Sequence, residues 1–150
     1  MLLSQSSTEA TVDTTKIYDI AEIPPSFSGG ENALMTYIAR TIRYPVIAQE
    51  FKVMGKIIVV FVVDRNGVIK DVHIENSLTK FLAPKCQLTS NNKRKRQKQE
   101  EYARSIENAK LALMIESLRV IKSMPNWIPG KFSGQNVICK FFVPINFKLQ

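Results

Sequence analysis

Apolar and polar positions change their period along the chain, and each change predicts an element. Ala33, Leu34, Tyr37 and Ile38 recur at helical spacing. The run Lys56–Val63 is apolar on both alternating faces, which is typical of a strand at the centre of a sheet. From about Asn136 to Leu149 apolar and polar residues alternate, which predicts a long strand with one buried face.

Turn-forming residues separate these elements. Asp64–Gly67 predicts a tight hairpin turn, because Asn and Gly accept a positive φ. The return strand, Val68–Asn76, is expected to point Val68, Val72 and Ile74 inward. The central strand therefore pairs with an antiparallel neighbour.

A second helix is expected before the final strand. Its pattern follows three- and four-residue steps through Tyr102, Ile106, Ala109, Leu113 and the polar Glu116, and it is continued by Leu118, Ile121 and Met124. The helix-compatible pattern begins at about Lys95, and Pro125 ends it. Trp127 is then expected to pack beneath the turn Ile128–Gly130.

The basic charge of the chain is local. Its net charge is +8, and the segment Thr79–Arg104 alone holds eight basic and two acidic residues. Its densest part, Lys93–Lys98, has no interleaved aromatic residues, which disfavours a nucleic-acid interface. A solvated charge run is the simplest interpretation, and attraction to an acidic partner or an anionic membrane surface is the alternative.

Several motifs occur in a defined order. The chain contains a Tyr-Pro-x-x-Ala-Gln motif at 44–49, then Gly55 before the apolar run Ile57–Val63, then Met124–Gly130 before the final strand. In that order they resemble the C-terminal domain of TonB proteins, which transmit energy from the inner membrane of Gram-negative bacteria to outer-membrane receptors. The resemblance covers Ile20 to about Asn76 and about Leu111 to Gln150, roughly two thirds of the chain.

The expected fold is α+β, with a three-stranded antiparallel sheet and two helices on one face. A right-handed crossover through the second helix places the last strand beside the central one, so the spatial order is two, one, three. Residues 1–19 are interpreted as a flexible linker, since they are rich in Ser and Thr. Residues 20–150 form the TonB-like domain, with a basic insertion at about 79–104.

The resemblance implies a periplasmic module that binds the TonB box or plug of an outer-membrane receptor by strand addition. Its partners are then that receptor and inner-membrane motor proteins, and its role is to couple inner-membrane energy to nutrient transport. No run reaches the roughly 18 to 20 apolar residues that cross a bilayer, so the resemblance implies an anchor in a longer protein. The alternative is a sensor or assembly domain that forms a homodimer through its edge strand without transducing energy.

Two segments are candidates for contact with a receptor peptide, one before the Tyr-Pro motif and one in the final strand, which is expected to be an exposed edge. The candidate residues are Arg40, Thr41, Ile42, Arg43, Tyr44, Pro45, Val137, Cys139, Lys140, Phe141, Phe142 and Val143. The structural alternatives are that Tyr44 and Pro45 end a helix, and that Lys140, Pro144 and Lys148 blunt the edge.

Catalysis is not expected. The sequence shows no nucleophile with a base partner and no cofactor fingerprint, and no metal is expected. His73, with Asp71 and Glu75 on one strand face, is interpreted as an exposed surface residue. Cys139 is interpreted as a small buried hydrophobe, and Cys86 lies in the basic segment.

Overall fold

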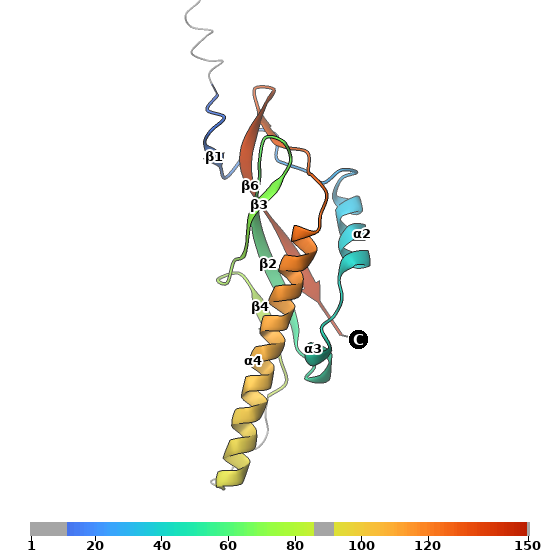
Figure 1. Ribbon diagram of the computed structural model, residues 1–150, viewed down its shortest axis with the longest axis vertical. Coiled ribbons are helices and arrows are strands. Elements are labelled where there is room, and N and C mark those ends of the chain that lie inside the picture. The colour runs from blue at the N-terminus through green and yellow to red at the C-terminus, as the bar shows by residue number, and fades with distance from the viewer. Residues whose placement is uncertain (1–11, 86–91, 150) are drawn as a thin grey trace, which may run out of the picture. The chain divides into compact units, whose positions relative to one another are not determined.

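The computed structural model describes residues 12–85 and 92–149, and this part of the chain folds as α+β (Figure 1). Its helices are α2 (Glu31–Thr41), α3 (Val46–Glu50) and α4 (Lys93–Lys122). Its strands are β1 (Ile17–Tyr18), β2 (Met54–Val63), β3 (Ile69–Ile74), β4 (Lys80–Leu82), β5 (Gly130–Phe132) and β6 (Gln135–Phe147). They form one sheet in the order β1-β6-β2-β3, with β4 also paired to β2 and β5 to β6.

The three long strands have the predicted order, because β2 lies between β3 and β6. The predicted number of elements is too low. Three strands and two helices were expected, whereas the described residues contain six strands and three helices. The additional strands β1, β4 and β5 have only two or three residues each. A segment that short shows no alternation, so its sequence pattern does not predict a strand.

The chain divides into two compact units, which share the long strands. Unit 1 comprises Met1–Arg40, Val60–His73 and Lys122–Val143, and it is described from residue 12 onwards. Unit 2 comprises Thr41–Val59, Ile74–Ile121 and Pro144–Gln150, without residues 86–91 and 150 in the description. Each unit has its own buried residues.

Aromatic rings form the centre of unit 1. The ring of Trp127 lies 5.1 Å from that of Phe61, 5.4 Å from Phe141 and 5.8 Å from Phe27 between centroids. Trp127 is 3% exposed, so its predicted burial is confirmed. Offset and edge-on contacts of this kind stabilise more than their buried area alone.

The turn between β2 and β3 is the predicted hairpin turn. The carboxylate of Asp64 accepts hydrogen bonds from the N–H groups of Asn66 and Val68, and Gly67 has φ +82°. Val68 is exposed rather than inward, and Asp71 has a left-handed φ of 52°. The left-handed φ of Asp71 interrupts the alternation between Val68 and the rest of the strand. The prediction that Val68 points inward is therefore wrong.

The long helix α4 supplies the buried helical face of unit 2. Ile106, Ala109, Leu113, Ser117, Val120 and Ile121 are its buried residues. The side chain of Asn92 accepts a hydrogen bond from the N–H of Arg94 and caps the helix, which begins two residues before the predicted position.

Part of the predicted basic insertion belongs to the sheet. Lys80–Leu82, which the sequence analysis assigned to the insertion, forms β4 and pairs antiparallel with Met54–Lys56 of β2. Cys86 lies outside the described residues. Of the predicted linker 1–19, the first eleven residues also lie outside the description, and its last residues contain β1. No helix in residues 12–85 or 92–149 has the length and hydropathy to cross a bilayer.

Candidate peptide-binding edge

The alternation of β6 sorts the candidate residues of unit 1 into two groups. Val137, Cys139 and Val143 are at most 2% exposed, whereas Lys140 and Phe142 are exposed. Phe141 is half-buried and packs against Trp127. The buried residues offer a partner only their main-chain groups, so side-chain recognition on this part of β6 falls to Lys140 and Phe142.

The strand at the end of the sheet is β1, not β6. Ile17 and Tyr18 run parallel to β6, opposite Ile138 and Cys139. The prediction that β6 is an exposed edge is therefore wrong at these two positions, and β5 also pairs with β6 at Gln135–Val137. In the described strands, β1 pairs with β6 only at Ile138 and Cys139, so its pairing does not extend to Lys140–Val143.

A small group of contacts holds β1 in place. The ring of Tyr18 lies 4.8 Å from that of Phe132. Both rings, with Val12, pack against the buried cluster Ala21, Val137 and Cys139. The ammonium of Lys140 lies 3.7 Å from the carboxylate of Asp19, but both side chains are largely exposed. An exposed ion pair contributes little, so Tyr18 is the main anchor of β1.

Cys139 is unsuited to nucleophilic chemistry. It is a free thiol, 1% exposed, and its S–H lies 3.3 Å from the carbonyl of Lys140. Burial raises the pKa of this thiol, against the opposing effect of the Ala21 N–H. The sulfur therefore stays protonated at neutral pH and acts as a core atom.

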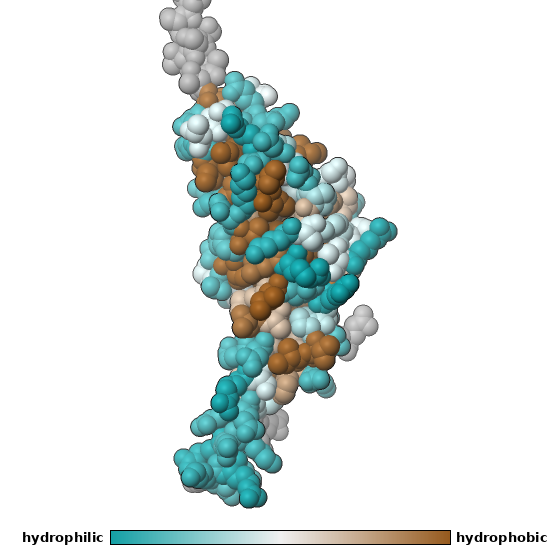
Figure 2. Space-filling view, viewed as in Figure 1, coloured by the Kyte–Doolittle hydropathy of each residue, from teal (hydrophilic) through white to brown (hydrophobic). Residues whose placement is uncertain are grey.

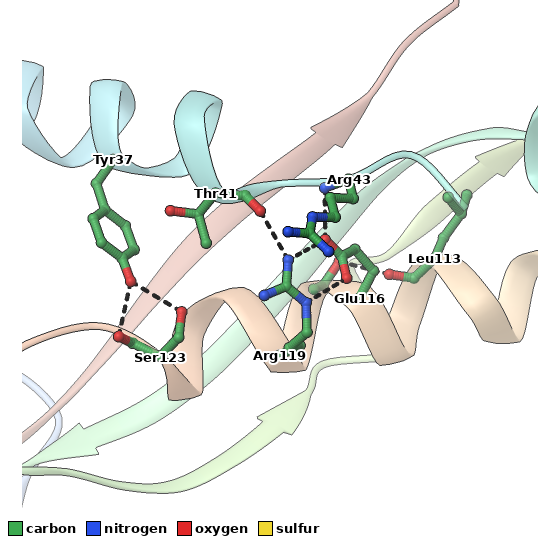
Figure 3. A network of polar contacts seen from close by, with 8 residues as sticks. Tyr37, Thr41, Arg43, Leu113, Glu116, Arg119 and Ser123 are labelled. Carbon is green, nitrogen blue, oxygen red and sulfur yellow. Dashed lines mark hydrogen bonds and ion pairs between the residues drawn. The ribbon is translucent and has the colours of Figure 1, made fainter. Parts of the chain in front are cut away.

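Arg40 lies at the C-terminal end of α2 in unit 1. It lines an open depression together with Phe27, Thr36 and Tyr37. The hydroxyl of Tyr37 lies 2.8 Å from the carbonyl of Ser123 and 2.9 Å from its hydroxyl, which ties α2 to the chain after α4 (Figure 3).

The remaining candidates before the Tyr-Pro motif belong to unit 2, where α4 holds their main chain. The N–H of Arg43 donates to the carboxylate of Glu116 at 2.6 Å. Arg119 donates from Nη2 to the carbonyl of Thr41 at 2.8 Å and forms two further hydrogen bonds with Glu116 (Figure 3). We call Thr41, Arg43, Glu116 and Arg119 the α4 clamp. In the clamp, the N–H of Arg43 and the carbonyl of Thr41 are already hydrogen-bonded to side chains of α4.

The charge of Glu116 is stabilised within this clamp. Its burial opposes ionisation most strongly, but the hydrogen bonds from Arg119 and from the Arg43 N–H outweigh burial and lower the pKa of Glu116 below its usual value. The ion pair with Arg119 has a contact distance of 2.7 Å, with the Glu116 side chain 11% exposed. The clamp is thus a partly buried, charge-assisted contact.

Tyr44 and Pro45 have structural roles. The hydroxyl of Tyr44 donates to the carbonyl of Val53, and its ring meets that of Phe147 edge-on at 5.4 Å. Burial raises the pKa of the Tyr44 hydroxyl. Pro45 directly precedes α3.

The exposure of the segment before the Tyr-Pro motif differs between its residues. Ile42 is half-buried, so Arg40 and Arg43 are the most exposed candidates of this segment.

His73 is exposed, and its Nδ1 lies 3.0 Å from the carbonyl of Asp71. In residues 12–85 and 92–149, no three His, Cys, Asp or Glu side chains gather in a way that could hold a metal ion.

Two features of the candidate site were not predicted from the sequence. The strand β1 has only two residues and no periodic signal. The pairing of Glu116 with Arg119 has a signal, since opposite charges three residues apart lie on one side of a helix. Its bonds to Thr41 and Arg43 join residues more than 70 positions apart, which no local pattern reveals.

Comparison of the chain with protein-family models, with curated proteins and with solved structures found no significant match.

Proposed function

We propose that this chain is a TonB-like module that binds an extended peptide of an outer-membrane receptor by adding it to the edge of β6. In this proposal the module acts in the periplasm, and inner-membrane motor proteins drive it. Catalysis, cofactors and nucleic acid have no part in it.

The observation that carries the proposal is the pairing of β1 with β6. An extended segment of the chain, Ile17–Tyr18, already occupies this edge in parallel register. The edge is therefore compatible with an added strand, and in this proposal the peptide continues along Lys140 to Val143, which β1 does not pair. The ordered motifs from Tyr44 to Gly130, and the arrangement of β3, β2 and β6, agree with the same family.

A receptor peptide that reaches Ile138 and Cys139 must displace β1. The two-residue pairing forms few main-chain hydrogen bonds, each worth about 0.5 to 1.5 kcal/mol net. A strand of about four to six residues forms more of them, so it competes successfully with β1 at modest affinity. We expect weak, reversible binding, which suits a transient partner.

Backbone chemistry gives the sharpest test. A synthetic TonB-box peptide is titrated calorimetrically into the full chain, in two forms that are N-methylated at alternate residues. In an added strand, successive N–H groups point to opposite sides, so only one alternating set bonds to β6. One methylated form should lose binding and the other should bind like the unmodified peptide.

Truncation tests the competition with β1. A chain that begins at Ala21 lacks Ile17 and Tyr18, and should bind the peptide about tenfold more tightly, which corresponds to about 1.4 kcal/mol. Tyr18→Ala should act in the same direction, because it removes the contact with Phe132. Ile20→Ala is the matched control, since Ile20 is 83% exposed and lies outside β1.

Equal loss of binding with both methylated peptides, or with neither, contradicts strand addition. Concentration-dependent dimerisation of the chain without peptide binding would instead favour the assembly domain that pairs with itself.

A further inference from the structure

The outward face of α4 in unit 2 carries exposed aliphatic side chains. Leu111 and Ile115 are 51% and 59% exposed, although large apolar residues on a helix usually face the core. They are four residues apart and therefore adjacent on the helix surface. They lie on the opposite side from the buried row that contains Ile106, Ala109 and Leu113. Figure 2 shows hydrophobic groups over the middle of this helix.

The first turns of the same helix are strongly basic. Lys93–Lys98 contains five cations and no acidic residue, and all six residues are exposed. No acidic side chain in the described part of unit 2 pairs with any of these cations. Figure 2 shows this end of α4 as a hydrophilic surface.

This arrangement is locally unfavourable in water. Arg94 and Lys98 are four residues apart and repel each other, and the N-terminal end of a helix is already positive. Glu100 and Glu101 follow within about one turn, but no ion pair in the described residues joins an acidic side chain to these cations, so an anionic surface outside the chain can complement them.

Cations and aliphatic groups share one side of α4. Arg104 precedes Leu111 by seven residues and Ile115 by eleven, which are close to two and three helical turns. Lys93 precedes Leu111 by eighteen residues, or five turns. One face thus presents Lys93 and Arg104 towards the N-terminus and Leu111 and Ile115 further along. We call these four residues the outer face of α4.

We propose that the outer face of α4, with the basic turns Lys93–Lys98, binds the surface of an anionic phospholipid membrane. The cations meet lipid phosphates, and Leu111 and Ile115 enter the boundary between headgroups and acyl chains. A nucleic acid is a poorer complement, because its phosphates pair with the cations but leave both aliphatic side chains in water. This contact does not depend on the peptide edge of β6, which belongs to unit 1 over the residues concerned.

The test measures sedimentation of the full chain with vesicles. Vesicles of equal parts phosphatidylglycerol and phosphatidylcholine should retain the chain, and pure phosphatidylcholine vesicles should retain at least tenfold less. Arg94→Glu with Lys98→Glu removes attraction, and Leu111→Ser with Ile115→Ser removes the aliphatic groups. Each pair should weaken retention by about tenfold or more, and raised salt should weaken it too.

Matched controls lie elsewhere in unit 2. Lys148→Glu reverses the charge of one exposed lysine outside α4, and Val46→Ser removes an aliphatic side chain that is 68% exposed. Both should keep vesicle retention, and circular dichroism should show the same helix content in all variants, because every changed side chain is exposed.

Three results would overturn the proposal. One is equal retention by neutral vesicles, and another is full retention of the Leu111→Ser, Ile115→Ser variant. The third is binding of a short DNA duplex, lost with the charge reversal, without retention by anionic vesicles; this would assign the basic turns to nucleic acid.

Discussion

At the scale of single residues, unit 1 depends on close contact between a glycine and a tryptophan. The N–H of Trp127 donates to the carbonyl of Gly67 at 2.8 Å, and a Cβ atom on Gly67 would clash with the carbonyl oxygen of Trp127. The hairpin turn and the buried ring are therefore positioned together. Only glycine fits position 67, because of both its positive φ and this contact.

Gly67→Ala should destabilise the chain by more than about 2 kcal/mol, since backbone strain and a clash with main-chain atoms add together. Gly30→Ala is the matched control, because Gly30 has φ +88° but no atom within 4 Å of a built Cβ. It should cost only about 1 kcal/mol, from the φ alone. Denaturant unfolding of both variants measures the difference, and equal losses would contradict the close contact.

Glu116 makes the stability of the chain pH-dependent. Its pKa is lower in the folded chain than in the unfolded chain, so its contribution is present above the unfolded pKa of about 4.3 and is lost as pH falls through the folded pKa. Glu116→Gln should therefore lower the free energy of unfolding at pH 7 and flatten its decline in acid. The comparison uses urea unfolding at several pH values, and an unchanged acid slope would show that the α4 clamp does not stabilise the charge.

Elements of different length differ in how well the sequence predicts them. Alternation in β6 predicted the common face of Val137, Cys139 and Val143. The helical pattern predicted Ile106, Ala109, Leu113 and Ile121 of the buried face of α4, but it missed Ser117 and Val120. The strands β1 and β4 were missed, because tertiary pairing rather than local propensity defines them.

The chain after β3 is joined to β2 by a side chain. The hydroxyl of Thr79 accepts a hydrogen bond from the N–H of Ile58 and donates to the carbonyl of Glu75. Thr79→Val keeps the shape but leaves the Ile58 N–H unpaired, so it should cost about 1 to 3 kcal/mol. Thr79→Ser keeps the hydroxyl and should cost less than about 1 kcal/mol. Thermal unfolding compares the two, and an unchanged stability of Thr79→Val would show that the hydroxyl hydrogen bonds contribute nothing.

At the scale of the whole molecule, the sequence predicted the class of fold but not the ends of the sheet. The order of β3, β2 and β6 follows from the apolar faces of β2 and from crossover handedness. The position of β1 on β6 depends on Tyr18 packing against Phe132, a contact across 114 positions that composition does not reveal. The same contact changes the candidate site, since β1 occupies part of the edge assigned to a receptor peptide.

Backbone amide shifts show where a peptide binds on the chain. A TonB-box peptide is titrated into the isotope-labelled full chain, and the shifts of β6 and β1 are followed together. Strand addition predicts large shifts from Ile138 to Val143, with loss of the paired signature of Ile17 and Tyr18. Saturation with shifts confined to Lys93–Lys98 would contradict the account, because the peptide would then be held by charge alone.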